Sequence, residues 1–204
     1  MTASMTKDLS ISEQLADLSR QASGDSVNLG WILDQLNERA FGLFLLILAL
    51  PCCIPFLYGV PQIVALPLVF VSGQIVLGKR VPWLPERLRR RPVKTTSLAE
   101  LSRRAAPILK RIEAVSVPRL AILTRPPLDR LVGIALLLFS ASILTPLPAT
   151  NTVPGIAVLL VSMGLLQRDG ILVGFGCLVG AAWIAALLLA GATLATLLRG
   201  WIGI

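Results

Sequence analysis

The chain has 204 residues, of which 55% are apolar and only 15% are charged, and its mean hydropathy is +0.79. Soluble domains carry about 25% charged residues, so this composition excludes an ordinary soluble protein and predicts an integral membrane protein. There is no histidine. Because histidine supplies much of the metal and acid–base chemistry of proteins, we expect no metal site, no cofactor and no enzymatic activity.

The formal net charge of +8 is unevenly distributed, because 14 of the 19 Lys and Arg residues lie between Lys79 and Arg130. The positive-inside rule places such a short basic segment, residues 79–130, on the cytoplasmic face of the membrane. Its charge would also attract anionic lipid headgroups. Nucleic acid is not an expected partner, since Trp83 is the only aromatic residue among these basic residues.

The first 39 residues predict cytoplasmic amphipathic helices. Ser10 and Glu13 form a capping-box pattern ahead of apolar residues at helical spacing, which predicts a helix over about 11–21. Asn28 is a candidate cap for a second helix with an apolar stripe ending at Ala40. Acidic residues stand where a signal peptide needs a basic start, so we expect no cleaved signal and a cytoplasmic N-terminus.

Residues 40–78 predict a membrane hairpin. Ala40 to Ile54 are apolar or small, and as a helix they rise about 22 Å, less than the roughly 30 Å hydrocarbon core. Pro51 and Pro55 are expected to interrupt this helix, and Pro67 to interrupt the apolar segment that follows. Two short, proline-broken segments predict a re-entrant hairpin or a tightly turned helix pair.

Residues 131–168 repeat this pattern. Gly42 follows the pair Glu38-Arg39 and precedes Pro55 by thirteen residues; Gly133 follows Asp129-Arg130 and precedes Pro146 by thirteen. We interpret this as an internal duplication of a hairpin. Both copies enter from the cytoplasmic side, so the repeat is expected to be parallel; an inverted arrangement would need an odd number of crossings between the copies.

The basic segment contains a predicted amphipathic helix over 98–115, with Ser97 and Glu100 as a second capping box. Its polar face carries the basic residues Arg103, Arg104, Lys110 and Arg111. Two compatible interpretations remain: the helix lies along the membrane surface, or it packs over the membrane domain with a solvated basic face.

Residues 171–198 are apolar or small and are long enough to span a bilayer. Gly174, Gly176, Gly180 and Ala181 provide small faces for helix packing, which makes a homo-oligomer an expectation. The predicted fold is therefore an all-α, multi-pass integral membrane protein with two repeated, proline-broken, re-entrant-like hairpins, a C-terminal transmembrane helix and cytoplasmic amphipathic helices.

Several short stretches resemble one known family. They are Leu36-Asn-Glu-Arg-Ala-Phe-Gly-Leu43, Ala49-Leu-Pro51 with Ile54-Pro55, Gly78-Lys-Arg-Val-Pro-Trp-Leu-Pro85 and Leu166-Gln-Arg-Asp-Gly170. In this order they resemble the ExoD family of bacterial exopolysaccharide synthesis proteins, over about residues 25–198. The resemblance implies a bacterial inner (cytoplasmic) membrane protein linked to exopolysaccharide production. The family has no established catalytic residues that could be assigned to positions in this chain.

The charged pairs at the hairpin mouths are the first candidate site. Arg39 and Arg130 could bind a phosphate headgroup, with Glu38 and Asp129 as proton-coupled partners. The alternative is that both pairs mark helix starts and join the repeats through salt bridges. For Arg168-Asp169 a role in a turn is favoured over a role in ligand binding.

The hairpin tips are the second candidate site. Tyr58 and Gln62 in one tip, and Thr150, Asn151 and Thr152 in the other, could meet inside the bilayer and form a polar site. Alternatively, they are polar turn residues at the outer interface.

Two further sets of residues are interpreted structurally. Ser72 and Ser162 are expected to bond to backbone carbonyls one turn earlier. We interpret Cys52 and Cys53 as small apolar residues that fill space in the interior, in preference to a redox-active pair of thiols.

The leading hypothesis is a non-enzymatic inner-membrane protein that supports exopolysaccharide synthesis or export as a carrier or translocator of an anionic lipid-linked intermediate. The alternative is a structural or regulatory partner of polysaccharide-synthesis proteins, working through the basic helix and without transport activity. An enzyme acting on a lipid-linked sugar ranks third.

Overall fold

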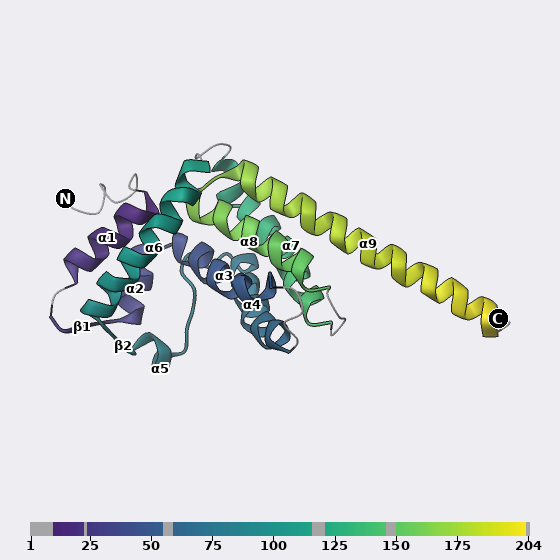
Figure 1. Ribbon diagram of the computed structural model, residues 1–204, viewed down its shortest axis with the longest axis horizontal. Coiled ribbons are helices and arrows are strands. Elements are labelled where there is room, and N and C mark those ends of the chain that lie inside the picture. Colours follow the sequence, from purple (N-terminus) through teal and green to yellow (C-terminus); the bar gives the residue numbers. More distant parts are fainter. Residues whose placement is uncertain (1–9, 23, 55–58, 116–120, 146–149, 203–204) are drawn as a thin grey trace.

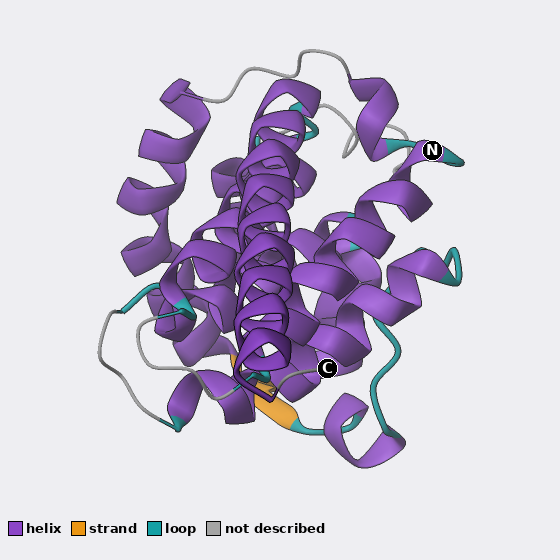
Figure 2. Ribbon diagram, turned by 90° about the vertical axis from the view of Figure 1, so that its right-hand side faces the viewer, coloured by secondary structure: helices purple, strands orange, loops and turns teal. Residues whose placement is uncertain are grey.

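The computed structural model describes residues 10–22, 24–54, 59–115, 121–145 and 150–202, and this part of the chain is helical apart from one small sheet (Figure 2). The elements in chain order are α1 (Ile11–Gln21), β1 (Ser26–Asn28), α2 (Leu29–Leu36), α3 (Arg39–Cys52), α4 (Val60–Val76), α5 (Glu86–Arg89), β2 (Pro92–Lys94), α6 (Thr95–Val115), η2 (Ala121–Thr124), α7 (Leu128–Ile143), α8 (Thr152–Gln167) and α9 (Gly170–Ile202).

The predicted helical class is confirmed. The antiparallel pair β1–β2, in which Val27 faces Val93, was not expected, because three-residue strands carry too little alternation to be recognised in a sequence.

The N-terminal unit consists of α1, α2, the β1–β2 sheet, α5 and α6, which gather at one end of the molecule (Figure 1). The predicted capping box at Ser10 is present, and α1 covers the predicted residues. Helix α6 packs against α1, and its buried residues Leu98 and Leu109 join Ile11 and Leu15 in one apolar cluster. At Leu98 and Leu109 the apolar face of α6 is thus covered by protein.

Two capping predictions in this unit are wrong. Asn28 precedes α2 but makes no side-chain capping bond. Helix α6 begins at Thr95, so Ser97 lies inside the helix; the amide of Thr95 instead donates to the carbonyl of Asp25, because the β1–β2 pairing brings the two residues together.

Helices α3, α4, α7 and α8 form a bundle in which α3 packs mainly against α8 and α4 against α7. Its centre is apolar, and the side chains of Leu45, Leu68, Leu136 and Val158 are fully buried. Close approach of the helices depends on glycine. A Cβ on Gly42 would lie 2.7 Å from the amide nitrogen of Leu166, and one on Gly133 would lie 2.9 Å from that of Val76.

The prediction that Pro67 interrupts its apolar segment is wrong, because α4 runs through it without a break. Pro51 likewise lies inside the last turn of α3. A helical proline removes one backbone hydrogen bond, but the packing of α4 against α7 outweighs this loss, so the helix continues. Pro55 and Pro146 lie outside the described residues.

Large apolar side chains cover much of the outer surface of the bundle. The exposed ones include Ile47 and Leu50 of α3, Ile63, Leu66 and Phe70 of α4, Leu131 and Leu138 of α7, and Ile156 of α8. Such a surface is unusual for a protein that faces water.

Helix α9 extends far beyond the bundle (Figure 1). Within the described part of the chain it is the one helix long and apolar enough to cross a membrane, over Gly170–Arg199. This agrees with the predicted span 171–198. Helices α3, α4 and α8 are apolar but shorter.

Candidate functional site

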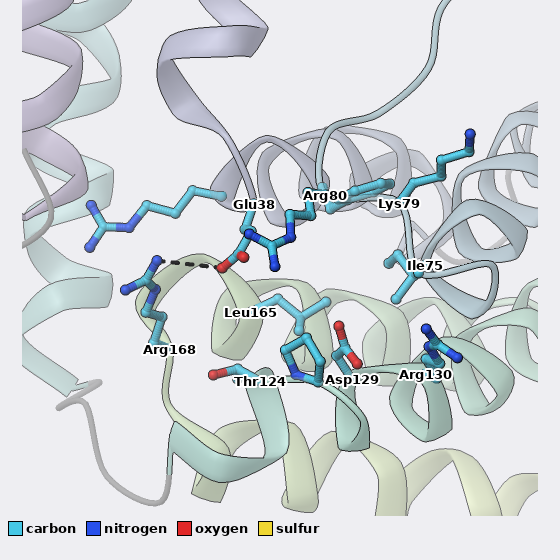
Figure 3. A pocket seen from close by; sticks show the side chains of 13 residues that line it. Glu38, Ile75, Lys79, Arg80, Thr124, Asp129, Arg130, Leu165 and Arg168 are labelled. Carbon is cyan, nitrogen blue, oxygen red and sulfur yellow. Dashed lines mark ion pairs between the residues drawn. The ribbon is translucent and has the colours of Figure 1, made fainter. Parts of the chain in front are cut away.

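A charged cavity lies where the four bundle helices meet the N-terminal unit. Helices α3 and α7 begin there and α4 and α8 end there, so residues far apart in the sequence line one space of about 190 Å³. Five basic residues and two acidic ones line it: Arg39, Lys79, Arg80, Arg130, Arg168, Glu38 and Asp129. Both predicted charged pairs are therefore brought together, and Figure 3 shows how their side chains are arranged.

Glu38 and Arg168 form an ion pair across this cavity. Nη2 of Arg168 lies 3.5 Å from Oε2 of Glu38 (Figure 3). Arg168 occupies the left-handed backbone region (φ 57°) at the end of α8. The carboxylate of Asp169 accepts from the amides of Ile171 (2.9 Å) and Leu172 (3.3 Å) at the start of α9. The predicted turn role is confirmed, and Arg168 also lines the cavity.

Arg39 connects the bundle to the N-terminal unit. Its Nη1 donates to Oε1 of Gln14 in α1 over 2.7 Å, and Nε2 of the same glutamine donates to the carbonyl of Gln35 over 3.1 Å. The glutamine is buried. Arg39 is therefore held by protein groups, which makes a positioning role more apt for it than the ligand-binding role considered from the sequence.

Asp129 and Arg130 occupy the opposite side of the cavity. Oδ1 of Asp129 is buried and has no hydrogen-bond partner among the described residues. The Arg130 guanidinium lies over Gly78: a Cβ there would be 2.9 Å from Nη2. Gly78 also has a φ of +71°, so both its backbone and its surroundings favour glycine.

The sequence does not single out Lys79 and Arg80 as site residues, although both lie within four residues of the end of α4 and line the cavity. In Figure 3, Arg80 lies near Glu38, whereas Lys79 extends away. With the basic excess and the apolar residues Phe41, Ile75 and Leu165 behind it, the cavity suits an anion such as a phosphate group.

A second, larger cavity of about 1110 Å³ adjoins the first and lies towards the N-terminal unit. It shares Glu38, Arg39, Arg80 and Arg168 with the charged cavity, and its remaining lining includes the polar residues Gln14, Asp34 and Gln35. The charged cavity thus has an apolar side towards the bundle and a polar side towards the N-terminal unit.

The hairpin-tip residues are not part of this cavity. Gln62 and Thr152 lie at the far ends of α4 and α8, about 20 Å along the helices from the charged residues. Asn151 is buried, and its Oδ1 has no hydrogen-bond partner in the part of the chain that the structure describes; Thr150 is half-buried. Tyr58 lies outside the described residues.

The predicted basic face of α6 is exposed. Arg103 and Arg104 both pair with Glu100, at 2.5 and 2.6 Å, so part of their charge is neutralised within the helix. Lys110 is exposed, and the side chain of Arg111 lies outside what the structure describes.

The predictions for serine and cysteine have mixed outcomes. Ser162 donates to the carbonyl of Leu159, as expected, but the hydroxyl of Ser72 has no partner among the described residues, so that half of the prediction is wrong. Cys52 is buried among apolar residues, and all three cysteines are free thiols. This agrees with an apolar filling role for Cys52.

Comparisons with known proteins identify the family. The model of the family described as exopolysaccharide synthesis, ExoD, matches residues 11–189. Protein ExoD of Rhizobium meliloti (strain 1021) is 33% identical over 172 residues, which cover 82% of this chain and 71% of that protein. The uncharacterized protein slr1875 of Synechocystis is 29% identical over 204 residues, covering 94% and 95% of the two chains. No solved structure matches the chain. This chain belongs to the ExoD family of exopolysaccharide synthesis proteins.

Proposed function

We propose that the protein supports exopolysaccharide synthesis as an inner-membrane carrier that binds the phosphate group of an anionic lipid-linked intermediate in the charged cavity. The observation that carries this proposal is the cavity itself, where five basic residues and two acidic ones meet at the end of an apolar bundle. Family membership supports the link with exopolysaccharide synthesis.

In this proposal the bundle lies in the membrane with its charged end at the cytoplasmic surface. Support comes from the exposed apolar side chains on α3, α4, α7 and α8 and from the length of α9. Helices of 14 to 17 residues rise about 21–25 Å, less than the hydrocarbon core, so α3–α4 and α7–α8 act as re-entrant hairpins. The N-terminal unit then lies in the cytoplasm and α9 crosses to the outside.

The two hairpins are parallel copies of one unit in this proposal. Gly42 packs against the backbone of Leu166, and Gly133 packs against that of Val76. Leu166 follows Ser162 by four residues and Val76 follows Ser72 by four, so the two contacts correspond under the repeat seen in the sequence. Equivalent contacts of this kind are expected of a duplicated unit.

Arginine suits the proposed ligand because its planar guanidinium can make paired hydrogen bonds to phosphate oxygens. Arg130 and Arg168 are the proposed phosphate-binding residues, and Arg80 supports them. Binding would replace the Glu38–Arg168 ion pair by a phosphate–arginine contact.

The test is translocation of a labelled polyprenyl phosphate in liposomes that contain the purified protein, with an anionic phospholipid for comparison. We expect flux above that of empty liposomes, and loss of that flux in Arg130→Ala and Arg168→Ala. Arg104→Ala is the control, since it removes the same charge from the exposed face of α6. No flux from folded wild-type protein would contradict the carrier role.

A second candidate function is a structural or regulatory partner of polysaccharide-synthesis proteins. The exposed arginines of α6, on the side away from α1, favour it. Reversing the charge of Arg103 and Arg104 would then abolish co-purification with synthesis proteins, while Arg130→Ala would leave co-purification intact. If the charge reversal at Arg103 and Arg104 leaves co-purification intact and Arg130→Ala abolishes it, the carrier role is the stronger proposal.

A further inference from the structure

The α4–α7 seam runs along the outside of the bundle and reaches the charged cavity. The helices are in close contact at Gly133, where there is no room for a side chain against the backbone of Val76. Nearer the cavity, the chain leaves α4 at Gly78, which has no side chain, and the Arg130 guanidinium lies over it. Both residues also line the cavity. One flexible side chain therefore occupies the place where the seam meets the cavity.

The surface beside this point is apolar and open. Leu77, next to Gly78, has 74% of its surface exposed, and Ile134, one helical turn after Arg130, has 44% exposed. A Cβ on Gly73, one turn before Leu77, would meet none of the described residues beyond its own stretch of helix within 4 Å. Gly73 and Leu77, which are four residues apart, share one side of α4, and Arg130 and Ile134 share one side of α7. The contact of Arg130 with Gly78 brings the cavity ends of these two sides together. An exposed apolar strip thus leads directly to a basic cavity.

We propose that the α4–α7 seam is a lateral entry path by which a lipid phosphate reaches the charged cavity from the membrane. The headgroup passes between Gly78 and Arg130, and the hydrocarbon tail stays outside against Leu77, Gly73 and Ile134. This inference rests on the proposed function and narrows its ligand to an amphiphile with a terminal phosphate.

The chemistry of the two surfaces favours this ligand. A phosphate group needs cationic donors, and the Arg130 guanidinium provides them at this side of the cavity. A hydrocarbon tail needs an apolar surface that continues from those donors. The long arginine side chain has an apolar stem and a charged tip, so Arg130 can line both surfaces at once. A free phosphate ion has no hydrocarbon tail to pack against the exposed apolar surface at Leu77 and Ile134. It would enter the charged cavity from the larger cavity of about 1110 Å³.

The experiment fills the seam and compares two sources of phosphate. Gly73→Trp adds a bulky side chain where there is open space, and Gly191→Trp does the same on α9, where a Cβ also meets nothing within 4 Å. Binding of phosphatidic acid to the detergent-solubilised full chain is measured by native mass spectrometry. Binding of inorganic phosphate is measured by calorimetry.

We expect Gly73→Trp to weaken phosphatidic acid binding by on the order of tenfold while leaving inorganic phosphate binding unchanged, and Gly191→Trp to change neither. Unchanged lipid binding in Gly73→Trp, or an equal loss for both ligands, would overturn the lateral path. If the wild-type protein binds inorganic phosphate but not the lipid, the ligand is a free anion and the path is again overturned. Binding of neither ligand would overturn the proposed function itself.

A second measurement needs no variant. Phosphatidic acid with a photoreactive group on its tail is cross-linked to the wild-type chain, and the adducts are mapped by mass spectrometry. Adducts on Leu77 or Ile134, competed away by unlabelled lipid, are expected. Competable adducts confined to α3 or α9 would overturn the α4–α7 path and leave the charged cavity as the phosphate site.

Discussion

Arg168 at the end of α8 and Glu38 just before α3 form an ion pair, with Nη2 and Oε2 3.5 Å apart. Their side chains are 28% and 42% exposed. An exposed pair of this kind contributes about 0–1 kcal/mol to stability. The pair is therefore not needed to hold the bundle together, and Arg168 can exchange its partner for an anionic ligand at little cost.

The first prediction follows from that low contribution. We expect Arg168→Ala to lower the free energy of unfolding by less than about 1 kcal/mol and to weaken phosphatidic acid binding on the order of tenfold. Thermal denaturation in detergent and native mass spectrometry measure the two effects. Arg104→Ala, which removes a charge from α6, should change neither quantity. A large loss of stability with unchanged lipid binding would assign Arg168 a purely structural role.

The second prediction concerns the two glycine contacts. A Cβ at Gly42 or Gly133 would lie within 3 Å of a backbone nitrogen, which cannot move without shifting a helix. Each change to alanine should therefore destabilise the protein by about 1–3 kcal/mol. Gly73→Ala is the matched control; it adds a methyl group in open space and should stabilise α4 by about 0.5–1 kcal/mol. A melting temperature for Gly42→Ala equal to that of wild type would contradict this packing.

Much of the fold could be predicted from the sequence because strong local patterns specify it. The capping box at Ser10 fixes the start of α1, and the uninterrupted apolar segment after Asp169 predicts α9. The matched spacing of Glu38-Arg39 and Asp129-Arg130 also identified four residues of the charged cavity. Helices α3 and α7 both begin at the cavity, so residues at equivalent positions near their starts lie at the same end of the bundle.

The rest depends on contacts between distant segments. Gln14 lies on α1, and nothing in its neighbourhood indicates that it binds Arg39, 25 residues later. Lys79 and Arg80 are part of a long basic stretch, and only the position of the end of α4 separates them from the other basic residues of that stretch. The prediction at Pro67 is wrong because the packing of α4 against α7 carries the helix through the proline, and the local sequence does not show that packing.

The third prediction tests the connection between the N-terminal unit and the bundle. Gln14→Ala removes a buried amide that bonds to Arg39 and to the carbonyl of Gln35. Leaving these groups without that partner should cost about 1–3 kcal/mol. Hydrogen exchange should increase in α1 and α2 and remain unchanged in α7 and α8. Gln21→Ala, also on α1, is a milder control because Gln21 is exposed. Uniform acceleration across the chain would instead indicate global destabilisation.

The fourth prediction concerns Asp129, whose Oδ1 is buried at the cavity and has no hydrogen-bond partner within the described ranges. A carboxylate beside a bound phosphate repels it, and asparagine keeps the size of the side chain while removing the charge. We therefore expect Asp129→Asn to bind inorganic phosphate more tightly, by about threefold to tenfold, with the largest gain at low salt, where screening is weakest. Glu86→Gln, which removes a charge from the exposed α5, should leave binding unchanged. Weaker phosphate binding in Asp129→Asn would mean that this carboxyl group contributes directly to the phosphate contact, and the arginines alone would then not account for the site.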